Sequence, residues 1–289
     1  MIKKKDKKLK KRMPAVCRAL QVFSIILFIF VLFFSLLSYA TTEKNLSRMT
    51  RVYVDDVEID KQYFDGYYLY DFTEDMCREL LEGEKMKALT SDIMKERLMA
   101  IFHNTSKFDY TEEEIKSTIH DEVVRVAKEG GVELKSEGLE AVVDYTCDIS
   151  GISTMLKFKT PAQYRTAIYD ADRESIDYIN SFLVTLSKIS SPLYAVFMLV
   201  LYLGSLVILV FLSNRFDVSF SIANTAIYPS LAIFAFSIGE IFMPDASVVT
   251  DYIFRKVLVV SGAGVILGIL LLVIYNHFFN KKIGKDSLE

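Results

Sequence analysis

The sequence of 289 residues is 52% hydrophobic and carries 34 Lys and Arg against 37 Asp and Glu, for a net charge of −3. This net charge averages two opposed regions, since residues 41–192 hold 30 acidic and 19 basic residues, about −11, while the rest of the chain is at about +8. Such an acidic region argues against nucleic acid as a partner. It is compatible with cationic ligands or with a solvated surface that binds nothing.

Four stretches of the sequence are long and apolar enough to cross a bilayer as helices. They cover residues 19–40, 193–212, 218–243 and 257–278. A helix needs about 20 apolar residues to cross a hydrocarbon core about 30 Å thick. The sequence therefore predicts a mainly α, polytopic membrane protein with four transmembrane helices in a 1+3 arrangement. A mostly helical extracytoplasmic domain, residues 41–192, is inserted between the first helix and the second.

Basic residues at the ends of these stretches predict their orientation. Residues 1–18 carry nine Lys or Arg against a single Asp, and residues 279–289 carry three Lys. Because basic flanks remain in the cytoplasm, these segments are expected to be a cytoplasmic leader and a cytoplasmic tail. Residues 41–192 then lie outside the plasma membrane.

The first stretch also fits a secretory signal peptide. A basic segment precedes it, and Ser38 and Ala40 place small residues three and one positions before Thr41, as at a cleavage site. The apolar run exceeds the length of about 7 to 15 residues that is usual in signal peptides. We therefore favour an uncleaved signal anchor, and both alternatives leave the insert outside.

Local signals predict several helices within the insert. Thr111 and Glu114 form a capping box, and apolar residues follow at helical spacing up to Gly130-Gly131. A second apolar stripe runs from Met86 to Phe102, a shorter helix is expected from Thr73 to Gly83, and Ser136 is expected to cap another. Only two segments, residues 51–54 and 57–59, are typical of strands.

The end of the insert predicts one long helix that leads to the second stretch. Thr160 and Pro161 suit the N-cap and the first helical position, and apolar residues then recur every three or four positions up to Ser191-Pro192. A helix of about 30 residues would span about 45 Å. Such a helix could transmit movement to the membrane, or it could be a plain core helix.

An aromatic segment follows the expected strands. Its six aromatic residues are Tyr63, Phe64, Tyr67, Tyr68, Tyr70 and Phe72. Three interpretations remain open: packing in the domain core, contact with lipid headgroups, and a binding groove.

The insert contains two cysteines, Cys77 and Cys147. In an oxidising compartment they could form a disulfide that closes a loop of about 70 residues and contributes about 3 to 4 kcal/mol. They could equally be two buried free thiols.

The apolar stretches contain few polar residues that could serve a function. Ser261, Gly264 and Gly268 would let another helix approach closely. Asn224, Thr225 and Glu240 are the candidate intramembrane polar residues. No charged residue falls at the middle of a stretch, which argues against an ion-coupled transporter.

Motifs for catalysis or for cofactors are missing from the sequence. His103 and His120 have no second histidine at metal-ligand spacing, and no nucleophile elbow, Walker A or dinucleotide motif occurs. We predict no catalytic residue, no metal and no cofactor.

The layout of one span, a large outer domain and three further spans is similar to that of mechanotransmission-type ABC permeases. In that family a longer cytoplasmic segment between the second and third spans grips the ATPase. Here the corresponding loop, residues 213–217, is too short for that role, and the resemblance covers the layout alone.

Taken as a whole, the sequence predicts an integral membrane protein whose outer domain senses a ligand or binds a partner. The expected partners are the lipid bilayer and a membrane or extracytoplasmic protein. A transport-associated subunit or pore is the alternative, and a membrane enzyme is the least favoured class.

Overall fold

The computed structural model describes residues 15–56, 58–105, 110–155, 157–158, 160–166, 173–212, 219–241 and 248–277. The chain divides into two compact units. The span unit comprises residues 1–36, 192–244 and 254–289, and the insert unit comprises residues 37–191 and 245–253. The predicted tail, the loop at 213–217 and most of the predicted leader lie outside the described residues.

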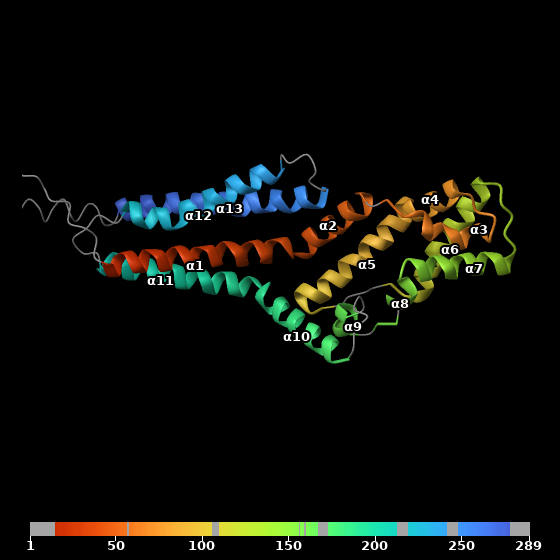
Figure 1. Ribbon diagram of the computed structural model, residues 1–289, viewed down its shortest axis with the longest axis horizontal. Helices are drawn as coiled ribbons and strands as arrows, with labels where there is room; N and C mark the ends of the chain where they lie inside the picture. Colours follow the sequence, from red (N-terminus) through yellow and green to blue (C-terminus); the bar gives the residue numbers. More distant parts are fainter. Residues whose placement is uncertain are drawn as a thin grey trace, which may run out of the picture. The chain divides into compact units, whose positions relative to one another are not determined.

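The predicted mainly helical fold is confirmed, and the described residues contain no strand (Figure 1). Four helices are long and apolar enough to cross a membrane, as predicted. They are α1 (Ala15–Ala40), α11 (Pro192–Leu212), α12 (Ser219–Ile241) and α13 (Val248–Tyr275).

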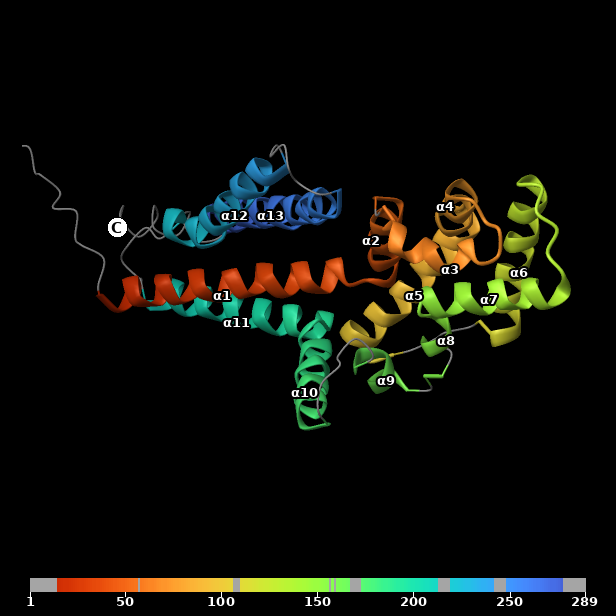
Figure 2. The ribbon, with the colours of Figure 1, turned by 45° about the vertical axis from the view of Figure 1, so that its right-hand side comes forward.

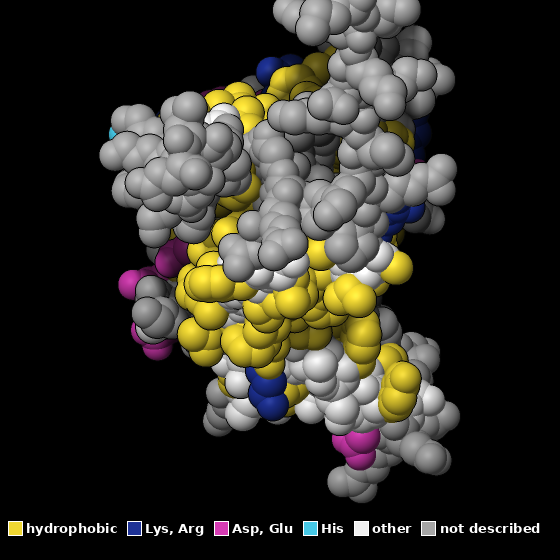
Figure 3. Space-filling model, turned by 90° about the vertical axis from the view of Figure 1, so that its left-hand side faces the viewer, with side chains coloured by type: hydrophobic (Ala, Val, Ile, Leu, Met, Phe, Trp, Pro, Cys, Tyr) yellow, Lys and Arg dark blue, Asp and Glu magenta, His cyan; other side chains and the backbone are white. Residues whose placement is uncertain are grey.

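The span unit has a small apolar core to which all four of these helices contribute. Phe28 of α1 packs on Tyr202 of α11, with ring centroids 4.9 Å apart, and Ile222 of α12 and Tyr275 of α13 belong to the same cluster. Many large hydrophobic side chains instead face outwards, such as Val200, which is 62% exposed. In Figure 3 hydrophobic side chains make up most of what is visible of the described residues. Helices that are apolar on all sides suit a lipid environment.

The insert unit consists of helices of 4 to 20 residues that surround a hydrophobic core of their own. Between α1 and α11 these are α2 (Glu43–Asp56), the 3₁₀ helix η1 (Lys61–Phe64), α3 (Asp65–Tyr68), α4 (Glu74–Glu82), α5 (Glu84–His103), α6 (Glu112–Glu129), α7 (Ser136–Ile149), α8 (Ile152–Met155), α9 (Pro161–Thr166) and α10 (Arg173–Ile189). The long helix α5 packs against α2, α4, α9 and α10 (Figures 1 and 2).

The helix starts predicted from Thr111 and Thr73 are confirmed. Thr111 and Glu114 make both hydrogen bonds of the capping box of α6. Thr73 caps α4 by accepting from the Met76 amide. Helix α7 begins at Ser136, but its N-cap is Lys135, one residue before the position predicted. The apolar stripe of α6 is fully buried where this helix packs on α4 and α7. Its residues are Ile115, Ile119, Val123 and Val126.

The prediction of a strand at residues 51–54 is wrong. These residues form the last turns of α2, whose Leu46 and Thr50 are buried one turn apart. The Thr50 hydroxyl lies 3.0 Å from that of Ser91 in α5. Packing of α2 on α5 therefore overrides the local strand preference of Val52 and Val54.

The prediction of one continuous helix from residue 160 to 191 is also wrong. Arg165 of α9 donates to the amide oxygen of Asn180 in α10 at 3.0 Å. In a straight helix, 15 residues would separate these positions by about 22 Å. α9 and α10 are therefore two helices that pack on each other, and Ile168 and Ala171 of the predicted stripe lie outside the described residues. The predicted start is right, since Thr160 and Gln163 cap α9 reciprocally.

Gly66 of α3 permits a close contact that holds the insert core together. A Cβ atom at this position would lie 1.8 Å from Cζ of Tyr145. The Tyr145 hydroxyl accepts from the Gly66 amide at 3.1 Å, and its ring packs edge-on against Tyr67. The Tyr67 hydroxyl in turn lies 2.7 Å from that of Thr146.

We predict that Gly66→Ala lowers the free energy of unfolding of the insert unit by about 1–3 kcal/mol, because the new methyl group must displace the Tyr145 ring. Gly138→Ala is the matched control, since its Cβ would meet only Leu134 at 3.9 Å. The control should be neutral or stabilising by up to about 1 kcal/mol. Denaturant unfolding of the full-length protein in detergent, followed by circular dichroism, measures both. Equal effects of the two variants would contradict the tight contact.

Candidate functional site

The last turn of α5 connects the two segments of chain that lead to the first two candidate spans. Thr41 directly follows α1, and its carbonyl accepts a hydrogen bond from Nε2 of His103. Ser190 lies just before α11, is fully buried, and donates to the carbonyl of Phe102 at 2.5 Å. We call residues Ala100–Asn104 the α5 terminus. The chain passes between the insert unit and a candidate span near Thr41 and again near Ser190, and we call these two places the chain crossings. Both chain crossings are thus attached to the same helical turn.

Arg165 binds the same turn from α9. Its side chain is buried, with the residue 3% exposed, and donates to the Ala100 carbonyl at 3.2 Å and to the side-chain oxygen of Asn104. Its Nη2 donates to Asn180 at 2.8 Å. A cation suits the C-terminal end of a helix, where free carbonyls concentrate negative charge. Burial lowers the pKa of the Arg165 guanidinium.

A further link involves the segment that precedes the last candidate span. The hydroxyl of Tyr252 donates to the Asn45 carbonyl at 3.3 Å. The side chain of Asn45, which is 5% exposed, donates to the Tyr39 carbonyl at 2.6 Å. Parts of α1, α2 and α13 that belong to the insert unit are therefore hydrogen-bonded to one another.

The aromatic segment at 63–72 is divided between core and surface. Phe64, Tyr67 and Phe72 are at most 2% exposed and belong to the insert core. Tyr63 and Tyr68 are 43% and 45% exposed, and Tyr70 is partly buried against the core. Burial raises the pKa of Tyr67, so this hydroxyl stays protonated as a structural donor.

Cys77 and Cys147 are free thiols in the same core, both fully buried. The sequence left open a disulfide or two buried free thiols, and in the structure both residues are buried free thiols with no disulfide between them. Burial raises the pKa of each thiol to about 11. Protonated thiols of this kind are unreactive near neutral pH.

A network of charged side chains ties α4, α5 and α6 together around Glu122, which is 3% exposed. Its carboxylate accepts from Lys85 of α5 at 2.7 Å and from Arg125 at 3.0 Å. Arg125 also contacts Glu79 of α4 at 2.6 Å and Glu129 at 2.9 Å. Burial opposes the charge of Glu122, but the hydrogen bonds from Lys85 and Arg125 outweigh it and lower its pKa.

The exposed side of the α6–α7 pair contains two neighbouring hollows. One, of about 420 Å³, is lined by apolar residues such as Val124 and Leu139 together with Lys128 and Glu133. The other, of about 400 Å³, is lined mostly by polar residues such as Lys116 and His120. Helix α7 adds a row of exposed acids at spacings of three and four: Glu137, Glu140, Asp144 and Asp148. It contains no Lys or Arg. We call this surface the α6–α7 face.

In the span unit, the glycines of α13 lie against α12. A Cβ on Gly264 would lie 2.2 Å from the Ser230 hydroxyl oxygen, and one on Gly268 would lie 2.5 Å from Ile227. Gly262, by contrast, has open space around it. Ser261 is buried, and its hydroxyl donates to the carbonyl of Val257 in its own helix.

Two pairs of polar side chains are hydrogen-bonded between helices of the span unit. Thr225 is fully buried, and its hydroxyl lies 2.8 Å from that of Tyr202. Ser24 and Ser205 make a similar pair between α1 and α11 at 2.8 Å. Asn224 is 8% exposed, while the side chain of Glu240 lies outside the described residues.

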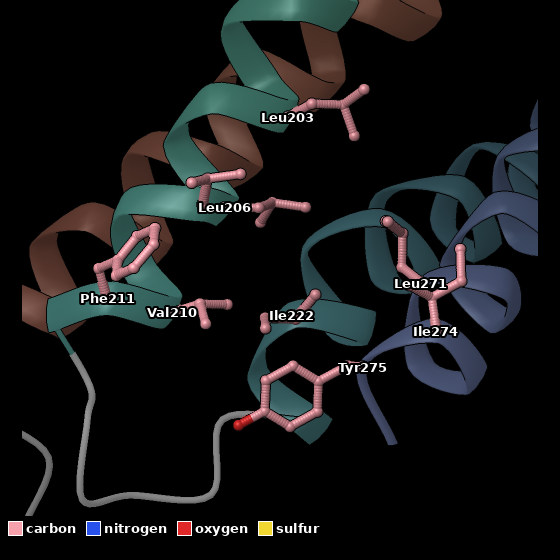
Figure 4. A pocket seen from close by; sticks show the side chains of 9 residues that line it. Leu203, Leu206, Val210, Phe211, Ile222, Leu271, Ile274 and Tyr275 are labelled. Atoms are coloured by element: carbon pink, nitrogen blue, oxygen red, sulfur yellow. The ribbon is translucent and has the colours of Figure 1, made fainter. Parts of the chain in front are cut away.

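A hollow of about 190 Å³ lies between α11, α12 and α13 (Figure 4). Its lining comprises Leu203, Leu206, Val207, Val210, Phe211, Ile222, Leu271, Ile274 and Tyr275. Because the lining is apolar apart from one tyrosine, the hollow offers no set of ligands for an ion.

No cluster of His, Cys, Asp or Glu able to hold a metal occurs among the residues with described positions. His120 instead pairs with its neighbour Asp121 at 3.6 Å. His103 is engaged at the α5 terminus. The sequence analysis named His103 and Phe102 of that terminus, but it predicted no role for either residue in holding the chain segments beside the spans. Arg165 and Ser190 were missed, because their partners lie 61 to 88 positions away in the chain.

Comparison with known proteins gives no relative for this chain. No family model matches it, and neither a curated protein nor a solved structure is significantly similar.

We predict that Glu122→Gln lowers the free energy of unfolding at neutral pH by about 1–3 kcal/mol, because two charge-assisted hydrogen bonds are weakened. Since the pKa of Glu122 is lower in the folded state than its ordinary 4.5, its stabilising effect is present above that value. It is lost as the pH falls through the lowered pKa. The difference between wild type and variant should therefore shrink in acid.

Glu113→Gln, on the first turn of α6, is the control and should change the free energy of unfolding by less than about 0.5 kcal/mol. Denaturant unfolding across the acid range measures both variants. A difference between wild type and Glu122→Gln that does not depend on pH would contradict the ionised state of Glu122.

Proposed function

We propose that this protein is a multi-pass membrane protein whose insert unit binds a protein partner and relays that binding to the membrane helices. In this proposal the span unit lies in the plasma membrane, both termini are cytoplasmic, and residues 41–192 are outside. The basic leader and tail support this orientation. The uncleaved first helix serves as a signal anchor.

The observation that carries the proposal is the attachment of both chain crossings to the α5 terminus. Thr41 and Ser190 bind adjacent residues, His103 and Phe102, of one helical turn. A movement of α5 would therefore change the positions of both crossings together. A domain that served only as a soluble appendage would need no such shared attachment.

The α6–α7 face is the surface that we assign to the partner. Its exposed acids, of which Asp144 pairs with Lys116, give it a negative row, and the hollow beside Val124 can accept a side chain. Complementary charge speeds association and selects among partners. A partner with a basic surface fits this face, and α6 connects it to α5 through Glu122 and Lys85.

A photo-crosslinking amino acid at Val124, in the full-length protein in its native membrane, tests this assignment. Val124 is 40% exposed, and Tyr53 on α2, which is 43% exposed, is the matched control position. We expect a specific adduct at position 124 that is weakened by Glu137→Lys and Glu140→Lys, because these changes reverse the charge of the face. Adducts that are the same at both positions, or that ignore the charge reversal, would refute the assignment.

A further inference from the structure

Helix α10 exposes two large aromatic side chains on its outer side. Tyr178 and Phe182 are 76% and 60% exposed. Four residues apart, they lie one above the other on the same side of the helix. The opposite side packs on α5 and α9, with Leu183 buried (Figure 2). The exposed side of α10 thus combines two aromatic rings with the small polar residues Ser181 and Thr185, and the described residues of the insert unit leave both rings uncovered.

The part of α10 between the exposed residues Asp177 and Lys188 carries no charge. Residues 178–187 contain no acidic or basic residue, although the insert as a whole carries 30 acidic and 19 basic residues. A neutral surface with exposed aromatic rings does not suit a partner recognised by charge. It suits the boundary between headgroups and acyl chains, where aromatic side chains concentrate.

The position of α10 in the chain places it close to a membrane surface. α10 ends at Ile189 and α11 begins at Pro192, so two residues, about 7 Å of extended chain, separate them. Tyr194 lies in the first turn of α11 and Tyr39 in the last turn of α1, as expected for tyrosines at the headgroup level. Phe182 precedes the end of α10 by seven residues, which is about 10 Å of helix.

We propose that α10 is an interfacial helix whose Tyr178 and Phe182 enter the headgroup region of the leaflet into which α11 inserts. The occupant that covers these two rings is therefore lipid. Contact with lipid stabilises these rings without a protein partner, and it fixes the start of α11 at the bilayer surface. The proposal is independent of the partner assigned to the α6–α7 face.

The chain contains no tryptophan, so a single introduced tryptophan reports on its own surroundings. Phe182→Trp and Tyr178→Trp are each placed in the full-length protein and reconstituted into phosphatidylcholine vesicles whose acyl chains are brominated near the headgroups. Phe197→Trp is the lipid-facing reference, because Phe197 lies on α11 and is 54% exposed. Free N-acetyltryptophanamide is the reference for water.

We expect brominated lipid to quench both α10 reporters to within about twofold of the Phe197→Trp reference. Aqueous iodide should quench them much less than it quenches the free amide. If iodide quenches the reporters and brominated lipid does not, the rings face water and the proposal is overturned. If neither quencher reaches them, a second copy or another protein covers α10, which also overturns it.

Discussion

The attachment of two distant chain crossings to the last turn of α5 is the constraint on which the rest of the insert unit depends. A helix ends with carbonyl groups that lack partners within the helix. Here Ser190 and Arg165 donate to two of them, and His103 of the same turn donates to Thr41. Because these groups are buried or partly buried, losing one partner leaves a polar group unsatisfied, at a cost of about 1–3 kcal/mol.

This constraint explains why the insert unit has its order of helices. α2 packs along α5 through the pair Thr50 and Ser91, and the end of α5 lies beside Thr41, where the chain leaves α1. α9 and α10 then approach the same terminus from the other end of the insert. α4, α6 and α7 contribute to the same core as α5, in which Tyr67 is fully buried and Gly66 admits the Tyr145 ring. The partner surface that we propose lies on that core, and α5 links it to the crossings.

Elements with strong local signals could be predicted from the sequence. The four apolar stretches, the capping box at Thr111 and the helix capped by Thr73 depend only on residues within a few positions of one another. The failures have a common cause. Residues 51–54 favour a strand locally, but packing on α5 makes them helical. The periodicity after Thr160 does not reveal that α9 and α10 are separate helices, which the contact between Arg165 and Asn180 requires. The α5 terminus is likewise built from residues far apart in the sequence.

Hydrogen exchange in the full-length protein tests most directly whether the two crossings are coupled through α5. The amides of Asn45 and Leu46 bond to the Thr42 carbonyl at the first crossing, whereas Ser190 lies at the second. Removing one buried hydrogen bond by Ser190→Ala costs about 1 kcal/mol, enough to raise exchange about fivefold where opening is local.

Our account predicts faster exchange at Asn45 and Leu46 as well as around Ser190, because both crossings share the α5 terminus. Thr185→Ala is the control, since the Thr185 hydroxyl bonds only within α10 among the described contacts, and exchange at the first crossing should not change. Faster exchange confined to the surroundings of residue 190 would contradict the coupling.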